Sequence, residues 1–219
     1  MKKKVYSNLD EIVADVPDGA RIMFGGFGGA GFPNNLIQAL VRKGVKNITA
    51  ISNNCGTRDG ELGLMFKNNQ ITHIIASFPG PHANHFQERF AAEEVTLELV
   101  PQGILCERMR AAAAGLQGFY TTVGVGTEVA EGKEERVLEG KRCILEKPIH
   151  ADFAFIKAHH GHGRKDDHCR SRRTRSPGFD RTGARDDARN LCAPYRAGER
   201  TPLCRIAPYR RKLCSTSRA

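Results

Sequence analysis

A glycine-rich segment near the amino terminus most constrains how this chain can fold. Residues 21–24 form a short apolar run typical of a strand, and five glycines then crowd into the seven positions 25–31. Pro33 opens an amphipathic segment at 34–42. Glycine adopts backbone angles that other residues avoid and lets a ligand approach the main chain closely, while proline suits the first turn of a helix. The segment therefore predicts a strand, a glycine turn and a helix whose N-terminus faces a phosphate or an acyl group.

Strand and helix patterns alternate through the first 160 residues. A first helix is predicted over residues 8–16. Further strands are predicted at 21–27, 47–53, 72–78 and 95–100, and helices at 33–43, 61–68, 82–92 and 104–114. A hairpin with strands at 135–138 and 142–145 and a last strand at 153–158 follow. Apolar strands between helices predict an α/β fold with an open, largely parallel sheet and helices on both faces.

The charge of the chain is unevenly divided. Its formal net charge is +10, and residues 161–219 carry all of it, with 14 Arg and 2 Lys against 5 Asp and 1 Glu. A basic surface favours nucleic acid or a membrane as partner, but here the excess lies outside the part with strand and helix patterns. We expect a neutral domain at 1–160, an irregular basic tail at 161–219, and neither nucleic acid nor a membrane as partner.

Other sequence signals favour a cytoplasmic protein without a metal site. The basic residues 2–4 are not followed by the apolar core of a secretion signal. The seven cysteines form no CxxC pair, so reduced thiols are expected, Cys55 among them as a packed thiol. His159, His160 and His162 do not have the spacing of a closed zinc site.

The glycine segment has two other interpretations from the residues alone. Residues 26–31 also fit the G-x-G-x-x-G fingerprint, which would indicate a nicotinamide-dependent oxidoreductase. That fold needs an acidic residue at the end of its second strand, whereas the strand ending at Ser52 is followed by Asn53 and Asn54. The glycines could also form a plain tight turn, and the tail alone would suggest a nucleic-acid-binding protein.

A series of short motifs occurs in one order along residues 18–158. The first is Asp18-Gly19 with the glycine segment and Pro33. The others follow at 51–56, 100–103, 107–111, 124–127, 130–134 and 151–158. Together they resemble the A chain of the two-chain family I coenzyme A transferases, and within that family the succinyl-CoA:3-ketoacid subtype. The resemblance covers residues 1–160 and implies the open α/β fold of these enzymes.

The resemblance also implies where ligands bind. The loop that approaches the CoA thioester would consist of Gly25, Gly26, Phe27, Gly28, Gly29, Ala30 and Gly31. Substrate contacts would come from Asn53, Asn54, Gln102 and Gly103. Neutral amides can donate to a thioester carbonyl or a carboxylate without adding a titrating group, although the same residue types are common in turns. On the helix after this site, Glu107, Arg108 and Arg110 are expected to be surface or subunit-contact charges.

Enzymes of the family pass CoA through a covalent intermediate. A glutamate carboxylate attacks the acyl-CoA, CoA passes to the enzyme as a glutamyl thioester, and the acceptor acid regenerates an acyl-CoA. The resemblance implies succinyl-CoA as donor and a 3-oxoacid such as acetoacetate as acceptor, with 3-oxoadipate or a short-chain fatty acid as alternatives. The family's glutamate lies in a Glu-Asn-Gly context on a B subunit, and this chain has no such motif. It would therefore hold no catalytic residue and no permanent cofactor, and would need a B subunit.

The basic tail has an explanation in the genetic code. Permitted codons for residues 166–172, read one base later, encode Met-Thr-Ile-Ala-Glu-Val-Glu, and residues 173–198 can continue into a string that resembles the C-terminal part of the family's A subunits. A further segment that the family has before this string is missing here. We therefore expect residues 161–219 to be translated out of frame, through a one-base shift combined with a deletion.

Overall fold

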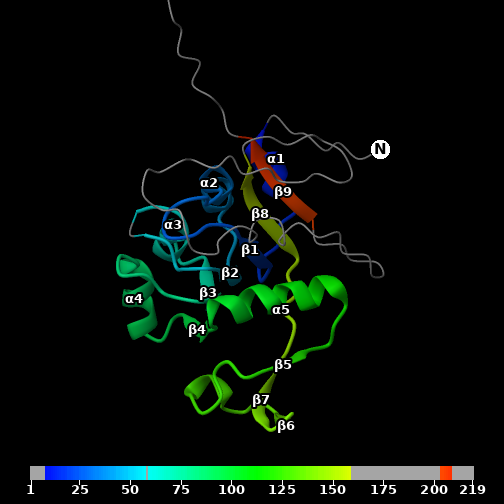
Figure 1. Ribbon diagram of the computed structural model, residues 1–219. Helices are drawn as coiled ribbons and strands as arrows, with labels where there is room; N and C mark the ends of the chain where they lie inside the picture. Colours follow the sequence, from blue (N-terminus) through cyan, green and yellow to red (C-terminus); the bar gives the residue numbers. More distant parts are fainter. Residues whose placement is uncertain (1–7, 58, 159–202, 209–219) are drawn as a thin grey trace, which may run out of the picture.

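A six-stranded parallel sheet forms the centre of the molecule. The computed structural model describes residues 8–57 and 59–158, together with the backbone of residues 203–208. The strand order is β4-β3-β2-β1-β8-β9, and every neighbouring pair is parallel (Figure 1). The strands are β1 (Arg21–Phe24), β2 (Ile48–Ser52), β3 (Ile71–Ala76), β4 (Thr96–Leu99), β8 (Phe153–Ala158) and β9 (Leu203–Pro208).

Helices cover both faces of this sheet, as the sequence predicts. The larger core cluster joins one face to α1 (Leu9–Val13), α2 (Asn34–Lys43), α3 (Gly63–Lys67) and α4 (Asn84–Ala91). The smaller cluster joins the other face to α5 (Gln102–Ala114) through Ile104 and Leu105. Alternation along the strands explains the division, because successive side chains of a strand point to opposite faces. Ala50 and Ile74 belong to the larger cluster, and Ile51 and Ile75 to the smaller one.

A small antiparallel sheet is inserted between α5 and β8. Its order is β5-β7-β6, with β5 (Phe119–Thr121), β6 (Glu135–Leu138) and β7 (Lys141–Glu146), and a 3-10 turn at Glu128–Ala130 precedes β6. The predicted hairpin is confirmed as the antiparallel pair of β6 and β7. Glu139 and Gly140 form its turn with positive φ angles of 49° and 74°. β5 was not predicted, because three residues are too few to show an alternating pattern.

Two features differ from the sequence-based expectation. The first strand ends at Phe24 rather than at 27, because Gly26 has a φ of 143° and leaves the extended conformation. The prediction of a wholly irregular tail was wrong for residues 203–208, whose backbone forms β9 parallel to β8. Backbone pairing needs no amphipathic pattern, so the composition of the tail did not indicate it. The remaining residues beyond 158, including the histidines near 160, lie outside the described part of the chain.

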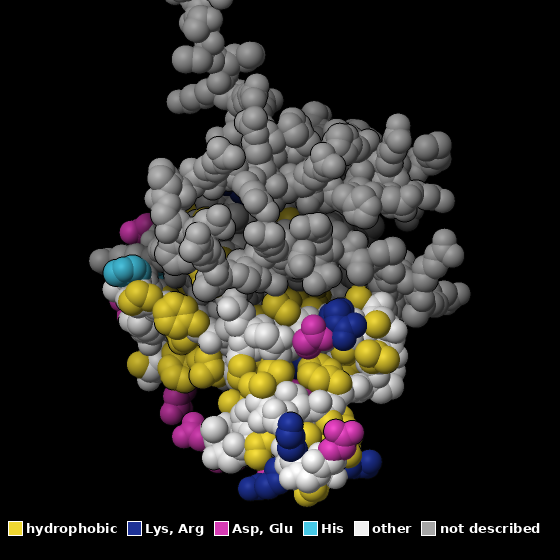
Figure 2. Space-filling view, viewed as in Figure 1, with side chains coloured by type: hydrophobic (Ala, Val, Ile, Leu, Met, Phe, Trp, Pro, Cys, Tyr) yellow, Lys and Arg dark blue, Asp and Glu magenta, His cyan; other side chains and the backbone are white. Residues whose placement is uncertain are grey.

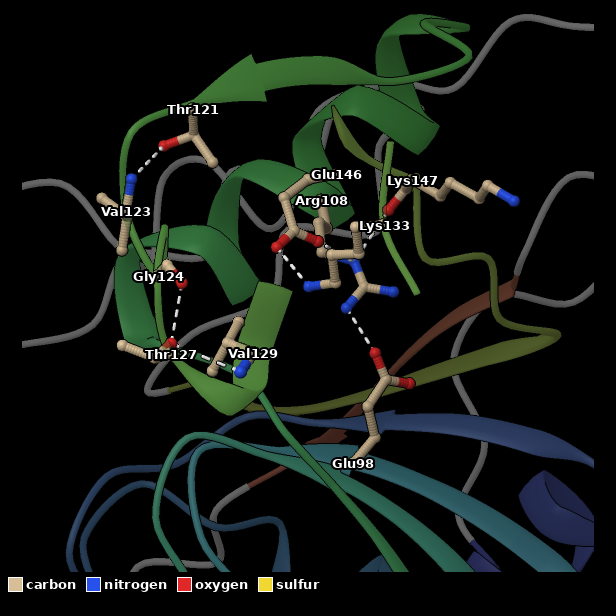
Figure 3. A network of polar contacts seen from close by, with 10 residues as sticks. All are labelled: Glu98, Arg108, Thr121, Val123, Gly124, Thr127, Val129, Lys133, Glu146 and Lys147. Carbon is tan, nitrogen blue, oxygen red and sulfur yellow. Dashed lines mark hydrogen bonds and ion pairs between the residues drawn. The ribbon is translucent and has the colours of Figure 1, made fainter. Parts of the chain in front are cut away.

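A network of charged groups around the buried Arg108 and Glu146 joins the small sheet to α5 and the edge of the main sheet (Figure 3). Glu146 on β7 is 1% exposed, and its Oε1 lies 2.6 Å from Lys133 Nζ. Arg108 on α5 donates from Nε to the Lys147 carbonyl at 2.7 Å, and its guanidinium pairs with Glu98 of β4 and with Glu146. The expectation that Arg108 is a surface charge was therefore wrong. Charge alone suggested exposure, but two carboxylates and a carbonyl compensate its burial.

Apolar side chains are visible on the face of the molecule that Figure 2 shows, over α4, β4 and α5. Phe90, Leu99 and Leu116 are each 44 to 51% exposed, and each follows or belongs to one of these elements.

No helix among the described residues is long and apolar enough to cross a membrane.

The buried network predicts unequal effects for two glutamates that each pair with an arginine of α5. Glu146→Ala leaves Arg108 and Lys133 short of a compensating charge in a low-dielectric site, so we expect a loss of about 3 kcal/mol in the free energy of unfolding. Glu107→Ala removes an exposed pair with Arg110 and should leave stability unchanged within error. Urea unfolding followed by circular dichroism compares the two variants. Equal midpoints would show that the network contributes nothing to stability.

Candidate functional site

The glycine loop is a tight turn fixed at both ends. Gly25 N–H donates to the Phe155 carbonyl of β8 at 3.0 Å, so the loop starts from the sheet itself. At its tip, Phe27 and Ala30 exchange two backbone hydrogen bonds of 2.9 Å. Gly26, Gly28, Gly29 and Gly31 all have positive φ angles. The loop then enters α2 through Phe32, which is 1% exposed and holds the turn against the core.

Much of the loop's hydrogen-bonding capacity is used within the chain. Gly25, Phe27, Gly29 and Ala30 donate their N–H groups to carbonyls of the loop or of β8. The Phe27 ring, by contrast, is 65% exposed at the tip. The loop can therefore present a close-packed backbone surface and one aromatic ring to a ligand, rather than a full cradle of N–H donors.

The two asparagines after β2 differ in their surroundings. Asn54 is 5% exposed, and its Oδ1 accepts a hydrogen bond from Gly56 N at 2.9 Å, which closes a local turn. Asn53 is half-buried, and its backbone carbonyl accepts from Ser77 N at 3.1 Å. The turn interpretation thus describes Asn54, while the side chain of Asn53 is the better placed of the two to meet a ligand.

Gln102 and Gly103 form the first turn of α5. Both are exposed, and Pro101 at the N-cap supplies no side-chain hydrogen bond to the helix. An uncapped helix N-terminus offers N–H donors and the positive end of the helix dipole to a negatively charged group. The sequence pattern predicts this helix only from residue 104, two residues too late. The N–H groups of Gln102 and Gly103 therefore fall outside the predicted helix.

The sheet topology brings the predicted site residues to one edge. Gly25 follows β1, Asn53 follows β2, and Gln102 lies shortly after β4. All these strands are parallel, so their carboxyl ends meet at the same edge, which is where open α/β sheets place their ligands. The described residues therefore place a loop, amide groups and a helix N-terminus along one edge of the sheet.

Glu61 is a neighbour of this loop that the sequence pattern does not indicate. It has a φ of 46°, unusual for a non-glycine residue. Its Oε2 accepts hydrogen bonds from Thr57 N at 3.0 Å and from Thr57 Oγ1 at 2.7 Å. Its Oε1 lies 3.8 Å from the place a Cβ on Gly29 would occupy, so the carboxylate packs beside the glycine loop. Glutamate in a polar turn carries no distinctive pattern, and only the fold shows this position.

Cys55 lies at the same edge but has the properties of a packed thiol. It is fully buried, and burial raises its pKa to about 12. A thiol with that pKa stays protonated at neutral pH, and the thiolate is the nucleophilic form. Cys55 is therefore unsuited to nucleophilic catalysis in this fold.

A shallow depression of about 650 Å³ lies elsewhere, in the inserted segment. Gly126, Thr127, Glu128, Val129 and Glu131 line it, and none of them is a predicted site residue. The neighbouring turn is held by Thr127, whose Oγ1 donates to the Gly124 carbonyl at 2.7 Å (Figure 3). Within the described residues, no group of three or more His, Cys, Asp or Glu is arranged to hold a metal ion.

Comparison with known proteins agrees with this geometry. The family model described as coenzyme A transferase matches residues 6–177, more than half of the chain. The chain belongs to the coenzyme A transferase family. This membership favours the acyl-transfer interpretation of the glycine loop over the dinucleotide and nucleic-acid interpretations.

The similar curated proteins include A subunits of CoA transferases. That of the probable succinyl-CoA:3-ketoacid coenzyme A transferase of Bacillus subtilis is 46% identical over 155 residues, which are 71% of this chain and 65% of that protein. That of the 3-oxoadipate CoA-transferase of Pseudomonas putida is 43% identical over 164 residues, which are 74% of this chain and 70% of that protein. The chain thus spans about two thirds of the length of these relatives.

Solved structures confirm the fold. The acyl-CoA transferase YdiF of Escherichia coli O157:H7 superposes with a TM-score of 0.61 at 23% identity, covering 69% of this chain and 33% of that one. The glutaconate coenzyme A-transferase of Acidaminococcus fermentans gives the same TM-score at 20% identity, covering 72% and 57%.

Two glycines of the loop should respond differently to the same substitution. A Cβ on Gly26 would lie 2.5 to 2.8 Å from three ring carbons of Phe32, at a φ of 143° that other residues do not adopt. We expect Gly26→Ala to lower the free energy of unfolding by about 3 kcal/mol, since strain and overpacking add.

Gly28→Ala is the matched control for this prediction. Gly28 has a φ of 63° with no atom within 4 Å of the new Cβ, so its cost should be about 1 kcal/mol. Thermal unfolding of both variants measures the difference. Equal losses would mean that the Phe32 ring does not constrain the loop.

Proposed function

We propose that this chain is the A component of a two-subunit CoA-transferase that moves CoA from succinyl-CoA to a 3-oxoacid such as acetoacetate. The observation that carries the proposal is the convergence of the glycine loop, Asn53 and the N-terminus of α5 at one sheet edge in a coenzyme A transferase chain. The relatives whose names specify succinyl-CoA:3-ketoacid coenzyme A transferase, at 41 to 46% identity, support the choice of substrates.

The chemistry at this edge suits a thioester carbonyl. When a carboxylate attacks the acyl carbon, negative charge develops on the carbonyl oxygen, and fixed neutral donors stabilise it without having to lose a proton. Asn53, Gln102 and the first N–H groups of α5 would supply those donors. The glycine loop would let the thioester approach the main chain. CoA is a substrate in this scheme, and the chain holds no permanent cofactor.

The attacking carboxylate is proposed to come from a B subunit in a heterodimer. The relatives' names as A subunits support a second subunit. We place the complex in the cytoplasm, with neither nucleic acid nor a membrane as partner. The alternative acceptor is 3-oxoadipate, which the Pseudomonas putida relative at 43% identity supports. A short-chain fatty acid is the remaining alternative.

Residues 161–219 are proposed to be an out-of-frame continuation, which defines a truncated A-subunit domain at 1–160. The relatives align with 71 to 74% of the chain, close to the share that residues 1–160 make up. The confinement of the net charge of +10 to residues 161–219 supports the same boundary. DNA sequencing across the codons of residues 159–166 tests the shift directly.

The function is tested by measuring CoA exchange after the frame-restored chain is co-expressed with the neighbouring open reading frame. We expect transfer from succinyl-CoA to acetoacetate to exceed transfer to 3-oxoadipate and to butyrate, with ping-pong kinetics, because the CoA is held covalently between the two half-reactions. A complex that retains a nicotinamide cofactor and exchanges no CoA would overturn the proposal.

The frame proposal predicts that the 219-residue chain is inactive even with its partner. Restoring the frame and the missing segment should rescue exchange, because the replaced part would normally complete the sheet and cover the site edge. Both forms are assayed side by side with the same B subunit. Robust exchange by the 219-residue chain would contradict the frame proposal while leaving the family assignment untouched.

A further inference from the structure

Two serine hydroxyls at the ends of neighbouring strands are buried without a hydrogen-bond partner among the described residues. They belong to Ser52, the last residue of β2, and to Ser77, which follows β3. Burying a hydroxyl without a partner costs free energy, so such groups are rare in folded proteins. Each of them needs a reason in packing or in function.

The strand register places Ser77 beside Asn53. Ser52 lies opposite Ala76 in the parallel pair of β2 and β3, and the strand pairing ends there. Just beyond it, Ser77 N donates to the Asn53 carbonyl at 3.1 Å, so the two residues stay neighbours past the ends of their strands.

The strand order also places Ser77 next to the start of α5. β3 lies between β2 and β4 in the sheet, and Ser77 directly follows β3. Val100 packs in the cluster shared with α5, and its N–H donates to the Ala76 carbonyl just before α5 begins. Asn53, Ser77 and the N-terminus of α5 therefore follow three neighbouring strands at one edge of the sheet.

We propose that Ser77 is a further binding residue, whose hydroxyl donates a hydrogen bond to an oxygen of the acyl or carboxylate group bound between Asn53 and the N-terminus of α5. This inference rests on the proposed function. The ligand oxygen would provide the partner that the hydroxyl lacks in the chain alone. Rotation about χ1 between staggered positions is enough to redirect a serine hydroxyl.

Ser52 is a matched control for this role. It is 3% exposed, its hydroxyl also lacks a partner among the described residues, and it lies on the same edge. Its neighbours Ala50 and Ala76 belong to the larger core cluster, so alternation directs Ser52 to the face opposite α5. The two serines thus share a buried hydroxyl without a partner, but Ser52 belongs to β2 whereas Ser77 lies beyond the end of β3.

The test compares Ser77→Ala, Ser77→Thr and Ser52→Ala in whichever form, 219-residue or frame-restored, exchanges CoA with its B subunit. We expect Ser77→Ala to lower kcat/KM for the 3-oxoacid by about tenfold, the loss typical of one hydrogen bond. Ser77→Thr keeps the hydroxyl and should recover most of the activity. Ser52→Ala should stay within about twofold of the parent. Unfolding midpoints should not fall in either alanine variant, because removing an unpaired hydroxyl leaves no other group without a hydrogen-bond partner.

Each outcome separates the role of Ser77 from the function of the chain. Normal exchange by Ser77→Ala, or equal losses in Ser77→Ala and Ser52→Ala, would overturn the role of Ser77 and leave the proposed function standing. A loss of activity that follows a lower unfolding midpoint would also overturn it. Absence of exchange in both parent forms would overturn the proposed function and this inference together.

Discussion

The parallel pairing of β1 with β8 is the constraint on which the rest of the structure depends. It joins residues that lie 131 apart in the sequence: Arg21 N donates to Asp152 Oδ2, and Asp152 N donates to the Arg21 carbonyl, each at 2.9 Å. Non-local pairs of this kind cost chain entropy before they yield contacts. The edge-to-face contact of Phe24 and Phe155, with ring centroids 5.8 Å apart, helps to offset that cost. The glycine loop then starts from this pair, because Gly25 donates to Phe155.

Local patterns were enough to predict most of the main fold and the sheet edge at which Asn53 and Gln102 lie. Apolar strands such as β3 and amphipathic helices such as α2 bury their own apolar faces, so their periodicity is visible in the sequence. The convergence of Asn53 and Gln102 also followed, since parallel strands align their carboxyl ends. Glycine content predicted a turn after β1, and the positive φ angles of Gly26 and Gly28 agree with it.

What could not be predicted depends on contacts between distant residues. Arg108 is buried only because Glu98, Glu146 and the Lys147 carbonyl meet it from other elements. Ser77 fell within a predicted strand, and its unpaired hydroxyl becomes visible only when β2 and β3 are in register. β9 pairs through its backbone, which the composition of the tail does not report. The assignment of ligand contacts at the edge stays a prediction.

The surroundings of Glu61 bear on the proposed role of a second subunit. Its carboxylate packs beside the glycine loop, so its position alone would make it a candidate nucleophile. Two hydrogen bonds from Thr57 occupy its Oε2, and hydrogen bonds to a carboxylate stabilise its charge and lower its tendency to attack. Its positive φ is compatible with only one backbone conformation of this turn, which fixes where the carboxylate lies. Glu61 is thus suited to holding the 57–61 turn against the loop, whereas covalent catalysis needs a carboxylate free to change partners. The proposed glutamate from a B subunit would satisfy that requirement, and neutral amides at the edge would leave room for its charge.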